Sequence, residues 1–118
     1  MNNPSLGFSR QWILKKPDSF RSLYRTGRRL RGETITLFYR REDGEHFLVG
    51  FTTRKKLAGS VGRNRVRRLM REVIRIHQHE IPKDLVCLFL WQGPVEGADF
   101  FSAEDEMMGL LRQGGLLL

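Results

Sequence analysis

One stretch of the chain, GSVGRNRVRRLMREVIRIH at residues 59–77, is unusually rich in arginine. No acidic residue occurs in it before Glu72. Five of its arginines lie within nine positions, namely Arg63, Arg65, Arg67, Arg68 and Arg71. A guanidinium group binds phosphate oxygens in pairs and stacks on bases. The residue type and its density therefore predict a surface that binds a polyanion such as a nucleic acid.

The charge of the whole chain supports this interpretation. The 118 residues carry a net charge of +8, and the isoelectric point is near 10.6. Residues 1–72 hold 18 Lys and Arg against 6 Asp and Glu, whereas residues 73–118 hold 3 against 7. Charge that served solubility alone would not be segregated in this way, so a polyanionic partner is favoured.

A charged face that merely contacts solvent is the alternative reading of the arginine-rich stretch. Such a face normally mixes signs, because like charges four residues apart destabilise a helix by a few tenths of a kcal/mol. Here the pairs 63/67, 67/71 and 71/75 are all arginines. The nucleic-acid interpretation is therefore preferred, and three further cations extend the surface upstream, Arg54, Lys55 and Lys56.

Side chains suited to catalysis are scattered. His46, His77 and His79 do not converge with a second proton-transfer group in any recognisable motif. The acids Glu104–Glu106 are better explained as partners of a helix dipole than as metal ligands. We therefore expect no catalytic side chain and no metal site on the protein.

The single cysteine and the hydropathy pattern bear on the compartment. Cys87 lies in the apolar run LVCLFLW, which predicts a buried thiol and excludes a disulfide within the chain. No apolar stretch approaches the roughly 20 residues of a membrane span. We therefore expect a cytoplasmic protein that does not engage a membrane.

Periodicity predicts the elements of the first half. Residues 1–13 read as irregular, with Phe8, Trp12 and Ile13 packing on the body. A short helix follows over residues 16–27, with Asp18 as its N-cap. Alternating segments 34–40 and 46–53 flank Asp43-Gly44, which predicts a tight β-hairpin. A short strand around Leu30 is expected to precede it.

The second half reads as helix, strand and helix. A helix over residues 60–79, capped by Ser60, gathers its apolar side chains on one arc, Val66, Leu69, Met70, Val73, Ile74 and His77. Its arginines and Asn64 occupy the opposite arc, with Arg65 at the edge. The apolar run 84–91 predicts a strand covered on both faces. A last helix begins with Ser102 as its cap, and residues 113–118 are expected to fray.

Together these elements predict one α+β domain over residues 1–118, in which helices pack on a small sheet. The unit from strand 46–53 through helix 60–79 to strand 84–91 predicts a βαβ crossover. Phe20 and Tyr24 share a face of the first helix and, with Phe38 or Tyr39, have the types needed to stack on bases. The residues alone favour the alternative that they belong to the core.

The motif over Lys55–Glu72 resembles that of the protein subunit of bacterial ribonuclease P. The family carries a lysine-rich loop, then Arg-Asn-Arg, an apolar residue, two basic residues, Leu, and Arg-Glu. The matching residues are Lys55-Lys56, Arg63-Asn64-Arg65, Val66, Arg67-Arg68, Leu69 and Arg71-Glu72. The similarity extends over roughly residues 6–91.

This resemblance implies a fold, a function and partners. The fold is a two-layer α-β-β-β-α-β-α sandwich, shared with a domain of a small-subunit ribosomal protein, with a left-handed βαβ crossover against the usual rule. The function is to assist the removal of the 5′ leader from precursor tRNA, where the RNA subunit with bound Mg²⁺ is the catalyst. The partners are that catalytic RNA and precursor tRNA, and the free protein is a monomer.

The resemblance also implies roles for particular residues. Arg63, Asn64, Arg65, Arg67, Arg68 and Arg71, continued by Arg54, Lys55 and Lys56, would face RNA. A cleft between the first helix and the sheet would hold the leader and include Phe20, Tyr24 and Phe38. Three rival readings stay open: a ribosomal or general RNA-binding protein, a stand-alone nuclease, and a DNA-binding helix.

Overall fold

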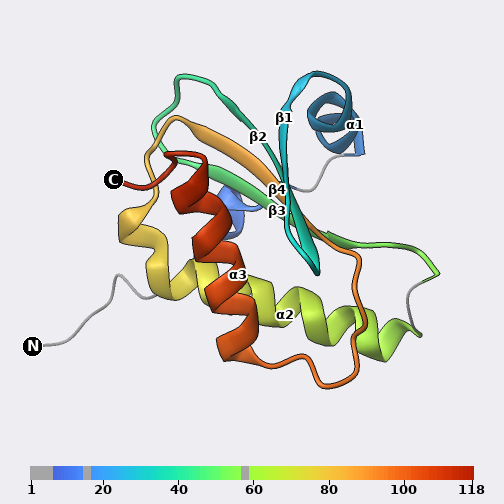
Figure 1. The fold of residues 1–118 in the computed structure, drawn as a ribbon. Helices are drawn as coiled ribbons and strands as arrows, with labels where there is room; N and C mark the ends of the chain where they lie inside the picture. The colour runs from blue at the N-terminus through green and yellow to red at the C-terminus, as the bar shows by residue number, and fades with distance from the viewer. Residues whose placement is uncertain (1–6, 15–16, 57–58) are drawn as a thin grey trace, which may run out of the picture.

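The computed structural model describes residues 7–14, 17–56 and 59–118. Its helices are the short 3₁₀ helix η2 (Arg10–Trp12), α1 (Pro17–Thr26), α2 (Ser60–His77), the 3₁₀ helix η3 (Gln78–Glu80) and α3 (Phe100–Gln113). Its strands are β1 (Arg28–Arg31), β2 (Ile35–Arg41), β3 (Leu48–Thr53) and β4 (Leu85–Trp91). The chain is therefore an α+β protein with the element order that the sequence predicts (Figure 1).

The four strands form one sheet in the order β1-β2-β4-β3. β1 pairs with β2 and β2 with β4 in antiparallel fashion, whereas β3 and β4 are parallel. The predicted hairpin between 34–40 and 46–53 is wrong, because β4 lies between β2 and β3. Two neighbouring pairings separate β2 from β3 by roughly 10 Å, too far for a tight turn at Asp43-Gly44. The most apolar strand takes the centre, where both faces are covered.

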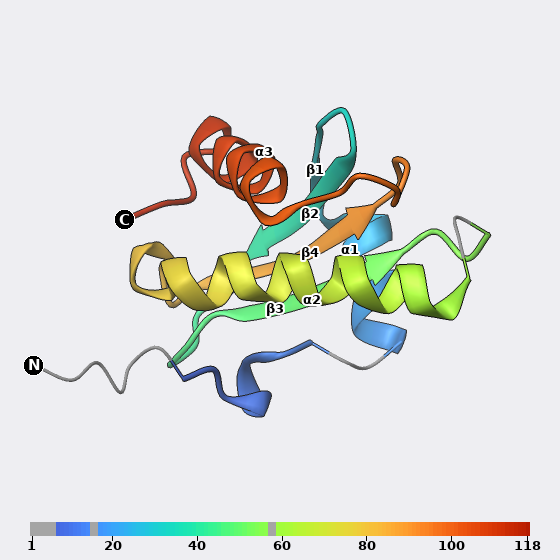
Figure 2. The same cartoon turned by 90° about the horizontal axis from the view of Figure 1, so that it is seen from below.

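The β3–α2–β4 unit is the predicted βαβ crossover. In Figure 2 α2 lies in front of the sheet, β3 and β4 both run from left to right, and β4 lies above β3. When the helix lies towards the viewer and both strands run to the right, a step upwards from the first strand to the second makes a left-handed crossover. This is against the usual right-handed rule. This hand confirms the expectation drawn from the resemblance, and it places the start of α2 beside the end of β3.

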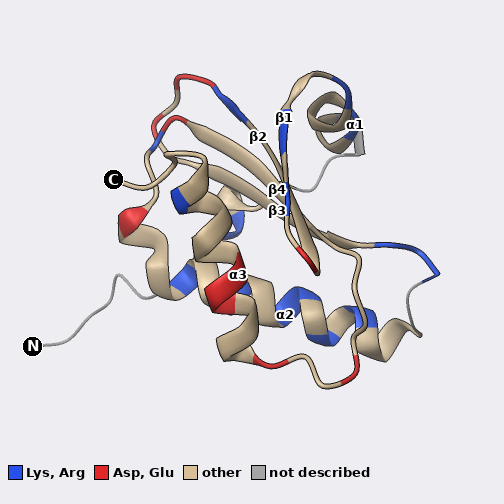
Figure 3. Cartoon of the chain, viewed as in Figure 1, with Lys and Arg blue, Asp and Glu red and all other residues tan. Residues whose placement is uncertain are grey.

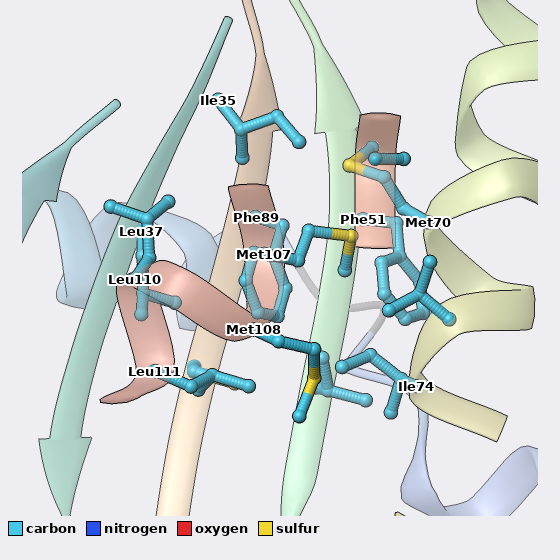
Figure 4. Packing of buried hydrophobic residues seen from close by; sticks show 14 of the residues in the cluster. Ile35, Leu37, Phe51, Met70, Ile74, Phe89, Met107, Met108, Leu110 and Leu111 are labelled. Atoms are coloured by element: carbon cyan, nitrogen blue, oxygen red, sulfur yellow. The ribbon is translucent and has the colours of Figure 1, made fainter. Parts of the chain in front are cut away.

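Alternation along the strands divides the apolar side chains between the two faces of the sheet. Leu37 and Phe89 point towards α2 and α3, where they meet Met70 and Met107 in the main core (Figure 4). On the other face, α1 buries Leu23 against Phe38, Val86 and Leu88. The sheet and the α2–α3 pair form the two layers of the sandwich, and α1 covers part of the opposite face.

The apolar arc of α2 holds the helix on the sheet. Val66, Met70, Val73 and Ile74 are fully buried. Each side chain of this kind contributes about 1.5–3 kcal/mol by leaving water. Because these positions recur at helical spacing, they fix the rotation of α2 and turn its arginine-rich arc away from the core.

The N-terminal segment is attached to the sheet where the structure describes it. Ile13 forms a parallel bridge with Val49, and the Leu14 N–H donates to the Val49 carbonyl at 2.7 Å. Phe8 and Trp12 pack against the main core, as predicted for residues 1–13, of which 1–6 lie outside the described residues. None of the described helices is both long enough and apolar enough to cross a bilayer.

The predicted helix caps are wrong at three helices. α1 begins at Pro17, so Asp18 lies inside its first turn. α2 begins at Ser60 itself, and Gly59 holds the N-cap position. α3 is capped by Asp99, whose carboxylate accepts from the Ser102 N–H at 2.8 Å. In each case the helix starts earlier than the first strong apolar periodicity indicates.

The predicted frayed tail at residues 113–118 is also wrong. Gly115 has φ +67°, and its N–H bonds to the Arg112 carbonyl while the Leu116 N–H bonds to the Leu111 carbonyl. These two bonds form a Schellman motif, which satisfies the last carbonyls of α3. Leu116 is buried in the main core, and the Leu118 N–H donates to the Glu80 carbonyl. The C-terminus is therefore a packed part of the fold.

Two glycines of this region allow a matched test of the C-terminal motif. Gly115→Ala should destabilise the protein by about 1–2 kcal/mol, because a Cβ is disfavoured at positive φ. Gly109→Ala, inside α3 with open space around a new Cβ, should stabilise it by about 0.5–1 kcal/mol. Urea unfolding of both variants measures the two effects, and equal effects of the same sign would contradict the described C-terminus.

His77 joins the end of α2 to α3. Its Nε2 lies 2.7 Å from a Glu104 carboxylate oxygen, and its Nδ1 contacts Glu80. Burial alone would lower the pKa of His77, but the hydrogen bonds to Glu104 and Glu80 outweigh it and raise the pKa above the ordinary 6.5. The protonated imidazole therefore binds both carboxylates and clamps the two helices together.

The clamp predicts a pH dependence of stability. Because the folded-state pKa of His77 is raised, its stabilisation is complete below the unfolded value of about 6.5 and is lost as pH rises through the folded value. His77→Gln should remove this dependence, whereas His79→Gln, two residues further along, should keep it. Denaturant unfolding between about pH 5 and pH 9 tests the difference, and an unchanged slope in His77→Gln would refute the clamp.

Candidate nucleic-acid interface

The arginine-rich arc of α2 faces a groove. The groove has a volume of about 550 Å³. It is lined by Ile13, Leu14, Phe20, Phe51, Asn64, Arg67, Arg68 and Arg71. Three segments that are distant in the sequence meet here: the N-terminal segment with the start of α1, β3, and α2. The groove therefore combines an apolar floor with a cationic wall.

The cationic wall has no acidic partners among the residues that the structure describes. Within the described part of the chain, Arg67, Arg68 and Arg71 form no ion pair with a carboxylate, and Arg67 donates to the Asn64 side-chain oxygen at 2.5 Å. Asn64, Arg68 and Arg71 are exposed. Guanidinium groups held together without acids attract the phosphates of a polyanion. The predicted separation of α2 into an apolar and a cationic arc is present.

Arg75 differs from the other arginines of this arc. It forms an ion pair with Glu72, three residues earlier on α2. The hydrogen bond from Arg75 lowers the pKa of the Glu72 carboxyl. Among the described residues, the part of the cationic surface that has no acidic partner therefore ends before the last turn of α2.

Arg65 does not belong to the groove. Its guanidinium donates to the Ala98 carbonyl at 2.7 Å and to the Val95 carbonyl, both in the loop between β4 and α3. The sequence placed Arg65 at the edge of the cationic arc, and the structure turns it to the α3 side. It acts as a tie that holds the loop against α2, in addition to the RNA contact that the motif predicts.

The upstream cations lie directly after β3. Arg54, Lys55 and Lys56 are exposed, and the Arg54 N–H bonds to the Trp91 carbonyl at the end of β4. The Arg63 guanidinium donates to the Lys55 carbonyl at 3.0 Å, which ties this loop to the first turn of α2. Figure 3 shows basic residues on this loop and along α2, while acidic residues lie on α3 and the loop before it and also in the loop between β2 and β3.

The three aromatics predicted for the cleft occupy different environments. Phe20 lines the groove beside the α2 arginines. Phe38 is only 8% exposed and belongs to the core under α1, so it supports its neighbours and offers no face to a base. Tyr24 is 42% exposed and packs edge-to-face on Phe38, with ring centroids 4.8 Å apart. Phe20 and Tyr24 remain the aromatics that a base can reach.

Sequence reasoning missed part of the groove floor. Leu14 and Phe51 line it, although neither carried a functional signal in the sequence. Both are ordinary apolar residues, and only the packing of the N-terminal segment on β3 brings them beside α2. Within the described residues no group of three or more His, Cys, Asp or Glu side chains is arranged to hold a metal ion. Cys87 is buried, and burial raises the pKa of its thiol strongly.

Solved structures define the class of protein first. The RNase P protein of Staphylococcus aureus superposes with a TM-score of 0.79 at 19% identity, covering 91% of this chain and 98% of that one. The RNase P protein of Thermotoga maritima gives a TM-score of 0.77 at 21% identity, covering 86% and 96%. The chain thus has the fold of bacterial RNase P proteins, as the resemblance implies.

Sequence comparison then gives the family. The model of the family described as Ribonuclease P matches residues 8–114. A ribonuclease P protein component of Clostridium botulinum (strain Alaska E43 / Type E3) is 31% identical over 110 residues, covering 87% of this chain and 88% of the relative. The chain belongs to the ribonuclease P protein family. Membership implies a part in tRNA processing, as the protein component of an endoribonuclease complex that has an RNA subunit.

Arg65 and Arg68 allow a matched test of the two roles found on α2. Arg65→Ala should destabilise the fold by about 1–3 kcal/mol, because two loop carbonyls lose charge-assisted hydrogen bonds. Arg68→Ala, exposed in the groove wall, should change the free energy of unfolding by less than about 0.5 kcal/mol. Urea unfolding measures both, and a stable Arg65→Ala variant would contradict the loop tie.

Proposed function

We propose that this chain binds the catalytic RNA of ribonuclease P through the α2 cations and holds the 5′ leader of precursor tRNA in the groove. In this way it assists the endonucleolytic removal of the leader to give the mature 5′ end. One observation supports the proposal above others. Arg67, Arg68 and Arg71 share a groove with Phe20, and none of the three arginines has a carboxylate partner in the described chain.

The groove has the two components that single-stranded nucleic acid needs. Cations along its α2 wall attract the phosphate backbone, while Phe20 and the exposed Tyr24 offer aromatic surface to bases. Stacking of this kind contributes about 1–3 kcal/mol per base and tolerates many sequences. That tolerance suits a protein which must accept leaders of different sequence.

The exposed cations outside the groove are suited to bind the catalytic RNA. Arg54, Lys55 and Lys56 continue the surface past the end of β3, and Arg63 joins this loop to α2. Two polyanions repel each other, and a protein that contributes positive charge between them lowers that repulsion. The protein then acts by charge and position, and it lowers the concentration of Mg²⁺ needed to assemble an active complex.

The described donors do not form a magnesium site on this protein. Three consecutive acids, Glu104, Asp105 and Glu106, lie on α3. Glu106 accepts hydrogen bonds from the Thr34 and Ile35 N–H groups at 2.8 and 2.6 Å. Glu104 contacts His77. We propose that Mg²⁺ is bound mainly by the RNA subunit and that no side chain of this chain is catalytic. We further propose a cytoplasmic location and a monomeric free protein.

A ribosomal or general RNA-binding protein without a processing role is the alternative. It shares the prediction of RNA affinity, since the cationic surface alone supports that much. The two functions differ in what they do to cleavage. A general RNA-binding protein would not stimulate removal of the leader, and a stand-alone nuclease would cleave without the RNA subunit.

Reconstitution tests the proposed function. The catalytic RNA, labelled precursor tRNA and limiting Mg²⁺ are combined with the protein or with an Arg67→Gln/Arg68→Gln/Arg71→Gln variant. The wild-type protein should restore cleavage, and the variant should lose at least about tenfold of the stimulation because several phosphate contacts are missing. Cleavage by the protein alone, or no stimulation by the wild type, would refute the proposal.

Salt dependence provides the control for this experiment. If the surface neutralises about five phosphates, the logarithm of RNA affinity should fall with the logarithm of salt concentration at a slope near −4. The triple variant should make that slope shallower by roughly 2–3, whereas Arg112→Gln, exposed at the end of α3, should leave it unchanged. Equal slopes for all three proteins would contradict the assigned surface.

A further inference from the structure

A second group of arginines lies on β1, away from α2. Arg28, Arg29 and Arg31 are exposed on this short strand at the edge of the sheet. In the part of the chain that the structure describes, none of the three forms a hydrogen bond or ion pair with a side chain. Figure 3 shows the basic residues of β1 beside α1 and at a distance from the basic face of α2. The proposed RNA contacts of α2 do not account for them.

The strand register places two of these arginines on the face of the sheet that carries α1. Arg29 is opposite Phe38, and Arg31 is opposite Thr36. Because side chains alternate along a strand, Arg28, opposite Tyr39, points to the other face. We call Arg29 and Arg31 the β1 arginines.

One row of paired residues crosses the sheet from the β1 arginines to the groove side. It runs from Arg29 through Phe38 and Leu88 to Gly50. Phe20 of the groove packs on Gly50 so closely that a Cβ there would lie 3.0 Å from its ring. The sheet has three strand spacings, so the β1 arginines lie roughly 14 Å across the sheet from β3.

The exposed aromatic Tyr24 lies between the two ends. It packs on Phe38, the residue directly opposite Arg29. Phe20 at the groove and Tyr24 are four residues apart on α1, so they lie on the same side of this helix, between the α2 wall and the β1 arginines. Cations at both ends with accessible aromatics between them are the pattern of a track for single-stranded nucleic acid.

Protection of the sheet edge is the other explanation for charge on β1. Charged side chains on an edge strand prevent pairing with another sheet. That role depends on charge at the edge and is served equally by either face. It therefore does not predict any difference between Arg28 and the β1 arginines.

We propose that Arg29 and Arg31 bind phosphates of the 5′ leader where it leaves the groove beyond Tyr24, so that a long leader binds more tightly than a short one. This inference rests on the proposed function, since it assigns the leader to the same face of the sheet. It adds a second phosphate-binding end to the site and a dependence on leader length.

The test measures the affinity of the reconstituted holoenzyme for precursor tRNAs with leaders of about 3 and about 10 nucleotides. Arg29→Gln/Arg31→Gln should weaken binding of the long-leader substrate by roughly five- to twentyfold and binding of the short-leader substrate by less than about twofold. Arg28→Gln/Arg112→Gln removes the same charge from the other face of β1 and from α3 and should leave both affinities unchanged.

Three results would overturn the inference. They are an equal loss with both leaders, the same loss in the Arg28→Gln/Arg112→Gln control, and no loss at all. Arg68→Gln reports on the proposed function separately, because it should weaken binding of both substrates. If Arg68→Gln weakens both and Arg29→Gln/Arg31→Gln weakens neither, only the leader extension is wrong. If Arg68→Gln also has no effect, the proposed function is wrong with it.

Discussion

Electrostatic repulsion along α2 is the constraint on which the rest of the structure depends. Arg67, Arg68 and Arg71 lie within about one turn and have no carboxylate partner in the described chain. The helix is kept in place by its other side, where Val66, Met70, Val73 and Ile74 are fully buried. Burial of several such side chains outweighs repulsion of a few tenths of a kcal/mol per pair. The core therefore supports a surface that is unfavourable until a polyanion covers it.

The same packing creates the groove. α2 runs beside β3 at the edge of the sheet, where the N-terminal segment bridges Val49. Gly50 has no side chain, and this allows Phe20 to approach β3. Arg65 holds α2 to the loop before α3, and the clamp made by His77 holds the end of α2 to α3 itself. Function and stability are thus divided between the two sides of one helix.

Much of this arrangement could be predicted from the sequence, because local periodicity carries it. The spacing of apolar residues gave α2 its two arcs, and the run LVCLFLW gave a central strand. The pairing of the strands could not be predicted in this way. Asp43-Gly44 is a strong local turn signal. Even so, β2 and β3 each pair with β4, which is distant from them in the sequence, and not with each other. A long-range pairing that buries both faces of an apolar strand overrides a local preference.

The candidate site shows the same limit. Charge and the ordered motif identified the cations, since these depend on residue type alone. The direction of Arg65 depends on a loop that returns from β4, and the burial of Phe38 depends on the path of α1 across the sheet. The packed C-terminus depends on Leu116 finding the core, which a run of glycine and leucine does not reveal. Contacts between distant segments decided each of these outcomes.

Arginine-selective chemical modification, read by mass spectrometry on the free protein and on the holoenzyme, shows whether the arginine-rich arc of α2 binds RNA. We expect Arg67, Arg68 and Arg71 to react in the free protein and to become protected when the catalytic RNA and precursor tRNA bind. Arg112, exposed on α3, should react equally in both states. If the three groove arginines were protected no more than Arg112, the acid-free face of α2 would not be an RNA-binding surface.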